Sequence, residues 1–195
     1  MKCKEGVKIE VSARHVHLCQ ADVDRLFGEG YELTKHHDIT GAFVANEKLV
    51  LIGPKRSIER VSILGPTRKE TQVEVSLTDA RTLGVEAKIR LSGDLAGTSG
   101  IKIKAVDTGN EIEIDHGVIA AKRHLHCGKP DAEELGLKNG DIVKLAIKND
   151  MARALVFDDV EVRVGGPASV VHIDTDEGNA CGIGKADVCT VIFEG

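Results

Sequence analysis

Two stretches of the sequence decide the fold: R-H-V-H-L-C-Q-A-D-V-D-R-L over residues 14–26 and R-H-L-H-C-G-K-P-D-A-E-E-L over 123–135. They align without a gap, and each begins with an Arg-His-x-His motif. Each has the pattern of a short strand, a loop and a short helix. Repetition of one such unit predicts two similar domains.

Alternating or continuous apolar segments, separated by Gly, Pro and Asn turn signals, surround both copies. Strands are expected at 7–11, 48–52, 73–77, 87–91, 101–106, 112–114, 142–147 and 160–164. Few and short helices are expected, with 21–27 and 130–135 as the best candidates. Many short strands with few helices predict a mainly β chain, folded as two small β-barrels capped by short helices.

The composition excludes several classes of protein. The formal net charge is -5, the basic residues are scattered along the sequence and aromatic residues make up 3%, which argues against the basic stripe and stacking rings of a nucleic-acid binder. No apolar run reaches the ~18 residues of a membrane span, and the first seven residues do not form a secretory signal. The five cysteines include no C-x-x-C pair, which indicates reduced thiols in the cytoplasm.

The two His-x-His pairs are the strongest chemical signal. Residues two apart on a strand point to the same face, so His15 and His17 converge, as do His124 and His126. On a helix they would diverge, because one turn takes ~3.6 residues. Same-face imidazoles suit zinc or a similar ion. The alternative is a half-exposed strand without a ligand, and repetition of the motif makes that less favourable.

Other polar residues give weaker signals. The arginines before each His pair face the opposite way, which favours salt bridges. Arg68 could bind an anion through its guanidinium, Glu74 could offer a carboxylate to a metal, and His172 could complete a three-histidine site. The acidic segment 174–179 is expected to be a loop, without EF-hand spacing. Segment 92–100 is glycine-rich but lacks the P-loop Lys, so an inter-strand loop is expected.

Five segments, in order along the chain, together resemble the PduL-type phosphate acyltransferases. They are S-A-R-H-V-H-L (12–18), G-P-T-R-K-E-T-Q-V-E (65–74), R-L-S-G-D (90–94), A-A-K-R-H-L-H (120–126) and H-I-D-T-D-E-G-N-A (172–180). The resemblance implies reversible, metal-dependent transfer of a propanoyl or acetyl group between coenzyme A and phosphate. It also implies that the N-terminal strand joins the C-terminal barrel, with 4–13 and 122–195 in one barrel and 14–121 in the other.

Matched residue by residue, the resemblance also implies a set of site residues and cofactors. Two divalent metal ions are expected, with zinc preferred although cobalt, nickel and iron also suit histidine. One ion would be held by His15, His17 and Glu74. The other would be held by His124, His126 and His172. Phosphate would bind Arg68, which is the catalytic candidate, and coenzyme A would contact Ser12, Lys35, Leu64 and Asn179.

The expected partners are acyl-CoA, phosphate, a second copy of the chain in a homodimer, and an acyl kinase that uses the product. Only about ten residues precede Val11, so no compartment-targeting extension is expected, and a cytoplasmic location is expected. Two alternatives stay open on the residues alone. One is a metal-dependent hydrolase of a phosphate or acyl ester. The other is a non-catalytic metal-binding β-barrel module.

Overall fold

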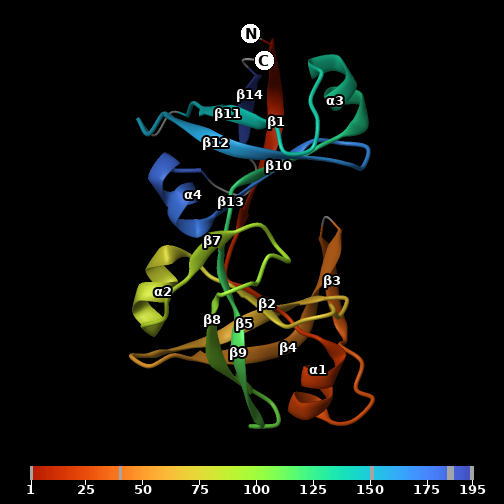
Figure 1. Cartoon of the computed structure of the whole chain (residues 1–195), viewed down its shortest axis with the longest axis vertical. Helices are drawn as coiled ribbons and strands as arrows, with labels where there is room; N and C mark the ends of the chain where they lie inside the picture. The colour runs from red at the N-terminus through yellow and green to blue at the C-terminus, as the bar shows by residue number, and fades with distance from the viewer. Residues whose placement is uncertain (1, 40, 150–151, 184–186, 194–195) are drawn as a thin grey trace. The chain divides into compact units, whose positions relative to one another are not determined.

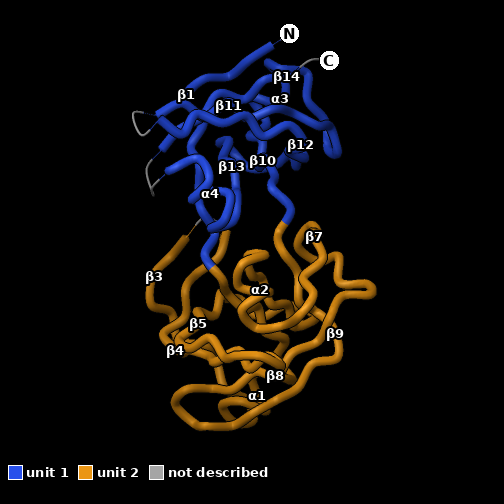
Figure 2. Tube along the Cα trace, turned by 90° about the vertical axis from the view of Figure 1, so that its left-hand side faces the viewer, with its two compact units in different colours: residues 1–13, 122–195 blue, residues 14–121 orange. Residues whose placement is uncertain are grey.

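Strands make up most of this computed structural model, which describes residues 2–39, 41–149, 152–183 and 187–193. The chain divides into two units (Figure 2). Unit 1 combines Met1–Ala13 with Lys122–Gly195, and unit 2 is Arg14–Ala121. Each unit has its own sheet and its own apolar core.

Unit 1 is a closed barrel with the strand order β1-β13-β10-β12-β11-β14 (Figure 1). Its strands are β1 (Lys2–Ser12), β10 (His124–Cys127), β11 (Ile142–Ile147), β12 (Leu155–Val164), β13 (Val170–Asp174) and β14 (Val188–Phe193). Its helices are α3 (Lys129–Leu135) and α4 (Thr175–Cys181). Closure leaves no free edge within this ring of described strands.

Unit 2 closes a second ring in the order β4-β5-β2-β6-β9-β8, with β3 attached to β4 and β7 attached to β9. Its strands are β2 (His15–His17), β3 (Lys35–Ile39), β4 (Ala42–Ile52), β5 (Ser57–Gly65), β6 (Gln72–Glu74), β7 (Lys88–Arg90), β8 (Ser99–Ala105) and β9 (Glu111–Ala121). Its helices are α1 (Gln20–Phe27) and α2 (Leu77–Leu83).

The first strand of the chain belongs to the barrel formed by the C-terminal portion. β1 runs parallel to β13, with Lys8 opposite Val170, and antiparallel to β14. The chain then continues into β2 of unit 2, and β9 at the end of unit 2 continues into β10 of unit 1. The predicted fold, two helix-capped β-barrels with this strand exchange, is confirmed.

Two sequence-based predictions of local structure are wrong. The predicted strand 73–77 ends at Glu74, because the side chain of Ser76 accepts a hydrogen bond from the amide of Asp79 and starts α2. The predicted acidic loop 174–179 is mostly helix α4. Its Asp174 and Glu177 form a reciprocal capping box, which satisfies free backbone amides of the first turn.

Both cores are built almost entirely from aliphatic side chains, as the scarcity of aromatic residues requires. Ile9, Leu125 and Leu145 are fully or almost fully buried in unit 1. Leu49 and Ile103 are fully buried in unit 2. Among the described residues, no helix is long and apolar enough to cross a membrane.

Candidate metal and phosphate sites

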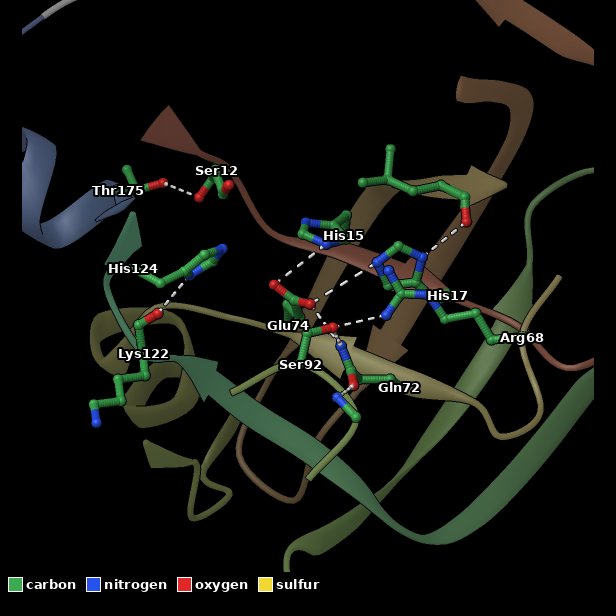
Figure 3. Close-up of polar contacts among 12 residues, drawn as sticks. Ser12, His15, His17, Arg68, Gln72, Glu74, Ser92, Lys122, His124 and Thr175 are labelled. Atoms are coloured by element: carbon green, nitrogen blue, oxygen red, sulfur yellow. Dashed lines mark hydrogen bonds and ion pairs between the residues drawn. The ribbon is translucent and has the colours of Figure 1, made fainter. Parts of the chain in front are cut away.

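In unit 2, strands β2 and β6 bring together His15, His17 and Glu74 (Figure 3). The strands are antiparallel, and His15 stands opposite Glu74. The two imidazoles lie on the same face of β2 because they are two residues apart. All three side chains are buried, with relative exposures of 7%, 3% and 8%.

The ligand atoms of this first triad lie at distances that suit a metal ion. His15 Nε2 is 3.4 Å from Glu74 Oε2, and His17 Nε2 is 3.9 Å from Glu74 Oε1. Donors on a tetrahedral ion with bonds of ~2.1 Å are about 3.4 Å apart. Two imidazoles and a carboxylate therefore fit a divalent ion such as Zn²⁺ after small side-chain movements.

In unit 1, strands β10 and β13 bring together His124, His126 and His172. His124 Nε2 lies 3.1 Å from His126 Nε2, and the His172 ring lies 5.2 Å from the His124 ring and 4.9 Å from the His126 ring, measured between centroids. Three imidazoles that converge in this way are a suitable ligand set for zinc or another divalent transition metal.

The two triads are built in the same way. In unit 2, His15 and His17 stand opposite Glu74 and Gln72 on an antiparallel strand. In unit 1, His124 stands opposite the third ligand of its own triad in the same register. In both units the strand with the histidine pair also has a parallel neighbour on its other side. The sequence repeat therefore corresponds to a repeated ligand geometry.

Backbone carbonyls hold one histidine in each triad. His17 Nδ1 donates to the carbonyl of Leu64 at 3.0 Å, and His124 Nδ1 donates to the carbonyl of Lys122 at 2.9 Å (Figure 3). A proton held on Nδ1 leaves the lone pair on Nε2, which is the nitrogen that faces the other ligand atoms. Both rings are therefore set in the tautomer that can bind a metal.

Charge and burial favour the metal-binding protonation states. Burial, together with the nearby His15 and Arg68, lowers the pKa of His17 to about 3. Burial alone would raise the pKa of Glu74, but hydrogen bonding and charge from His15 outweigh it and lower the value to about 2. Burial, with charge from its neighbour in the same triad, also lowers the pKa of His126. Near neutral pH, His17 and His126 are neutral and Glu74 is ionised.

Arg68 places a cation beside the unit 2 triad. Its backbone amide donates to the carbonyl of Leu18 at 2.9 Å, which fixes its position, while its side chain is exposed. Its guanidinium Nη1 donates to Ser92 Oγ at 2.7 Å. Its charge acts on both His17 and Glu74. An anion bound by this guanidinium would therefore lie close to the first triad.

Two residues of this site were not identified from the sequence. Gln72, 1% exposed, donates through Nε2 to Glu74 Oε1 at 2.5 Å and to Ser92 Oγ at 2.9 Å. Its Oε1 accepts from the amide of Gly93 at 2.7 Å. The signal for Gln72 was its position two residues before Glu74 on a strand, hence on the same face. Ser92 lies in two segments noted in the sequence, 90–94 and 92–100, but neither indicated its role, because only tertiary folding brings it to Arg68.

The arginines that precede the His pairs form salt bridges, as predicted. Arg14 Nε donates to Asp79 Oδ2 at 2.9 Å within unit 2. Arg123 Nε donates to Glu177 Oε1 at 2.6 Å within unit 1. These side chains therefore stabilise their own units and do not join the triads.

The glycine-rich segment 92–100 is a loop until β8 begins at Ser99, as predicted. It contributes to the site through its first two residues, because Ser92 and Gly93 hydrogen-bond with Gln72. The segment therefore supports the phosphate candidate Arg68 through Ser92, without the geometry of a P-loop.

The four coenzyme A candidates are divided between the units. In unit 1, the carbonyl of Ser12 accepts from Thr175 Oγ1 at 3.4 Å (Figure 3). Asn179, also in unit 1, is exposed on α4. In unit 2, Lys35 on β3 pairs with Ala45 of β4, and Leu64 on β5 pairs with Val44 of the same strand. Lys35 is exposed and its Nζ contacts a nearby aspartate of β3. The contact with coenzyme A stays a prediction for all four.

All five cysteines are free thiols, as expected from their spacing. Burial raises the pKa of the Cys127 and Cys181 thiols, and it raises that of Cys189 to about 12. A protonated thiol is a poor nucleophile. These three buried cysteines are therefore unsuited to covalent catalysis.

Comparison with known proteins agrees with the resemblance carried by the five motifs. A family model described as phosphate propanoyltransferase matches residues 8–184. A phosphate propanoyltransferase of Clostridioides difficile is 47% identical over 98% of this chain and 91% of its own length. Those of Listeria monocytogenes (48%, over 92% of this chain and 84% of its own) and Thermotoga maritima (45%, over 98% and 91%) are similarly close.

Proposed function

The chain belongs to the phosphate propanoyltransferase family, and we propose that it transfers a short acyl group, propanoyl or acetyl, between coenzyme A and inorganic phosphate. The observation that carries the proposal is the repeated triad geometry, with one triad lying beside the guanidinium of Arg68. Family membership supports the reaction, and the triads support its dependence on metal.

We propose that His15, His17 and Glu74 hold one divalent ion. The second ion is held by His124, His126 and His172. Such ions, when bound, supply a template and a Lewis acid for phosphate and carbonyl oxygens. The neutral imidazoles and the ionised carboxylate described above are the forms that bind a cation. Zinc suits both ligand sets.

Arg68 is proposed to bind the phosphate. A guanidinium fork matches two phosphate oxygens, and the fixed backbone of Arg68 limits the entropy lost on binding. Ser92 Oγ, 2.7 Å from Nη1, orients the guanidinium before phosphate arrives. Gln72 links Ser92 to Glu74, so the phosphate-binding group and a metal ligand are held by one hydrogen-bonded chain.

The proposed acyl transfer is direct. An oxygen of the phosphate attacks the thioester carbonyl, the C–S bond breaks, and the thiolate of coenzyme A leaves with the bonding electrons. Arg68 holds the attacking phosphate in position, which supplies rate through proximity. No acyl-enzyme intermediate is needed, in agreement with the raised pKa of the buried thiols.

The test is to mix acetyl or propanoyl phosphate with coenzyme A, follow the loss of free thiol, and repeat the assay after treatment with a chelator. The proposal expects thiol loss that stops when metal is removed and returns when zinc is added. Thiol loss unaffected by chelation would refute the metal dependence while leaving the transferase assignment. Loss of acyl phosphate without coenzyme A would instead identify the hydrolase.

The partners follow from the proposed reaction. The acyl phosphate product is a substrate for an acyl kinase, which would place the two enzymes in consecutive steps. The homodimer and the cytoplasmic location stay predictions, and analytical ultracentrifugation of the purified chain measures the first.

A further inference from the structure

A buried hydroxyl group connects the two ligand-bearing strands of unit 2. Thr71, immediately before β6, is 6% exposed, and its Oγ1 accepts from the amide of Cys19 at 3.1 Å. The same hydroxyl donates to Oδ2 of the buried Asp22, on α1, at 2.6 Å. The hydroxyl thus joins the chain after the His15–His17 strand to the chain before Glu74.

Unit 1 contains the same arrangement. Ser169, immediately before β13, accepts through Oγ from the amide of Gly128 at 2.9 Å. It donates to Asp131 Oδ2, on α3, at 2.5 Å. This hydrogen bond lowers the pKa of Asp131, so the carboxylate is the charged acceptor.

The equivalence extends along both sequences. Asp22 and Asp131 occupy the same position in the repeated Arg-His-x-His segments. The hydroxyl residue stands three positions before the third ligand in each unit, so T-Q-V-E (71–74) matches S-V-V-H (169–172). The match continues into the helices that follow, α2 and α4. Asp79 on α2 accepts a hydrogen bond from Arg14 Nε, and Glu177 on α4 accepts one from Arg123 Nε.

We propose that Thr71 and Ser169 are positioning residues, each of which sets the distance between a His-x-His pair and the third ligand of its metal ion. The inference rests on the proposed metal sites. Each hydroxyl accepts a hydrogen bond from a backbone amide and donates one to a carboxylate, which ties the segment before the third ligand to the segment after the histidine pair. Groups that hydrogen-bond directly to metal ligands typically change metal affinity about 10–100-fold when removed. Thr71 and Ser169 act on the ligand-bearing strands instead, so we expect the low end of that range, about 10-fold.

A cobalt titration of single variants tests the inference. Thr71→Val keeps the shape of the side chain but removes the hydroxyl, while Thr71→Ser keeps the hydroxyl. Ser169→Ala and Ser169→Thr form the corresponding pair in unit 1. Thr98→Val is the matched control, because Thr98 is also buried in unit 2 and hydrogen-bonds through its hydroxyl, to Leu95 and Gly117.

The readouts are the visible spectrum of bound Co²⁺, the dissociation constants and the melting temperature. The wild type is expected to bind two ions. Thr71→Val and Ser169→Ala should each weaken the binding of one ion by about 10-fold. Thr71→Ser and Ser169→Thr should restore wild-type binding, and Thr98→Val should leave both constants unchanged whatever its melting temperature.

If Thr71→Val and Ser169→Ala both bind two Co²⁺ ions with wild-type affinity, the inference is overturned while the proposed function stays intact. If one variant does not fold, the other decides, because it lies in the other unit. A wild type that takes up no Co²⁺ would refute the proposed metal sites themselves, and the inference would fall with them.

Discussion

Replacing Arg68 with alanine should damage phosphate use far more than folding. The side chain is exposed and hydrogen-bonds to Ser92 near the surface, so its loss should change the free energy of unfolding by no more than about 0.5 kcal/mol. A bidentate guanidinium–phosphate contact contains two charge-assisted hydrogen bonds, each worth about 1.5 kcal/mol or more. Their loss is ~3 kcal/mol, or roughly 100-fold.

The assay measures release of coenzyme A from acyl-CoA while phosphate is varied. The 100-fold loss is expected in kcat/KM for phosphate, and Arg68→Lys should recover part of it, because it restores the charge without the fork. Lys69→Ala is the matched control, since Lys69 is the next residue, is exposed and carries the same charge. Equal kcat/KM for phosphate in Arg68→Ala and Lys69→Ala would refute the assignment.

Three further outcomes are expected. His124→Ala should lose about one of two bound zinc ions and most activity, whereas His36→Ala, an exposed histidine of β3, should keep both, as metal analysis will measure. The metal-free protein should lose stability as the pH falls from 6.5 toward 3. The pKa of His17 is about 3 in the folded protein and 6.5 when unfolded, and that of Glu74 is about 2 and 4.5, so the unfolded chain takes up protons that the folded protein does not. Equal denaturation midpoints at pH 7 and pH 4.5 would contradict this. Leu145→Ala should cost about 2–5 kcal/mol of unfolding free energy by denaturant titration, and a loss below about 1 kcal/mol would contradict its role in the core.

The sequence predicted those parts of the site that depend on local geometry. The side-chain period of a strand is enough to place His15 beside His17, and His124 beside His126. The third ligands required more, because Glu74 lies far from His15 along the chain and only strand pairing brings them together. The family resemblance supplied that information, and the ligand roles themselves stay predictions.

Irregular backbone explains much of what the sequence did not predict. Strand β5 was missed because Arg60 has a positive φ of 56° where the pairing with β4 shifts register, so the apolar residues on its two sides do not alternate regularly. Helix α4 was missed although D-T-D-E, its capping box, was visible at 174–177. Apolar periodicity alone therefore missed β5, whose pattern is interrupted by the register shift, and α4, whose start is marked by its capping box.

The exchange of β1 has a consequence for synthesis on the ribosome. β1 is made first, but Lys8 pairs with Val170, whose translation at roughly 5–20 residues per second follows about 8–30 s later. All strands of unit 2 are synthesised within that interval, so the unit 2 barrel can close before β13 and β14, the partners of β1, have been made. The lysines at 2, 4 and 8 give this waiting strand the charge that discourages pairing with other nascent chains.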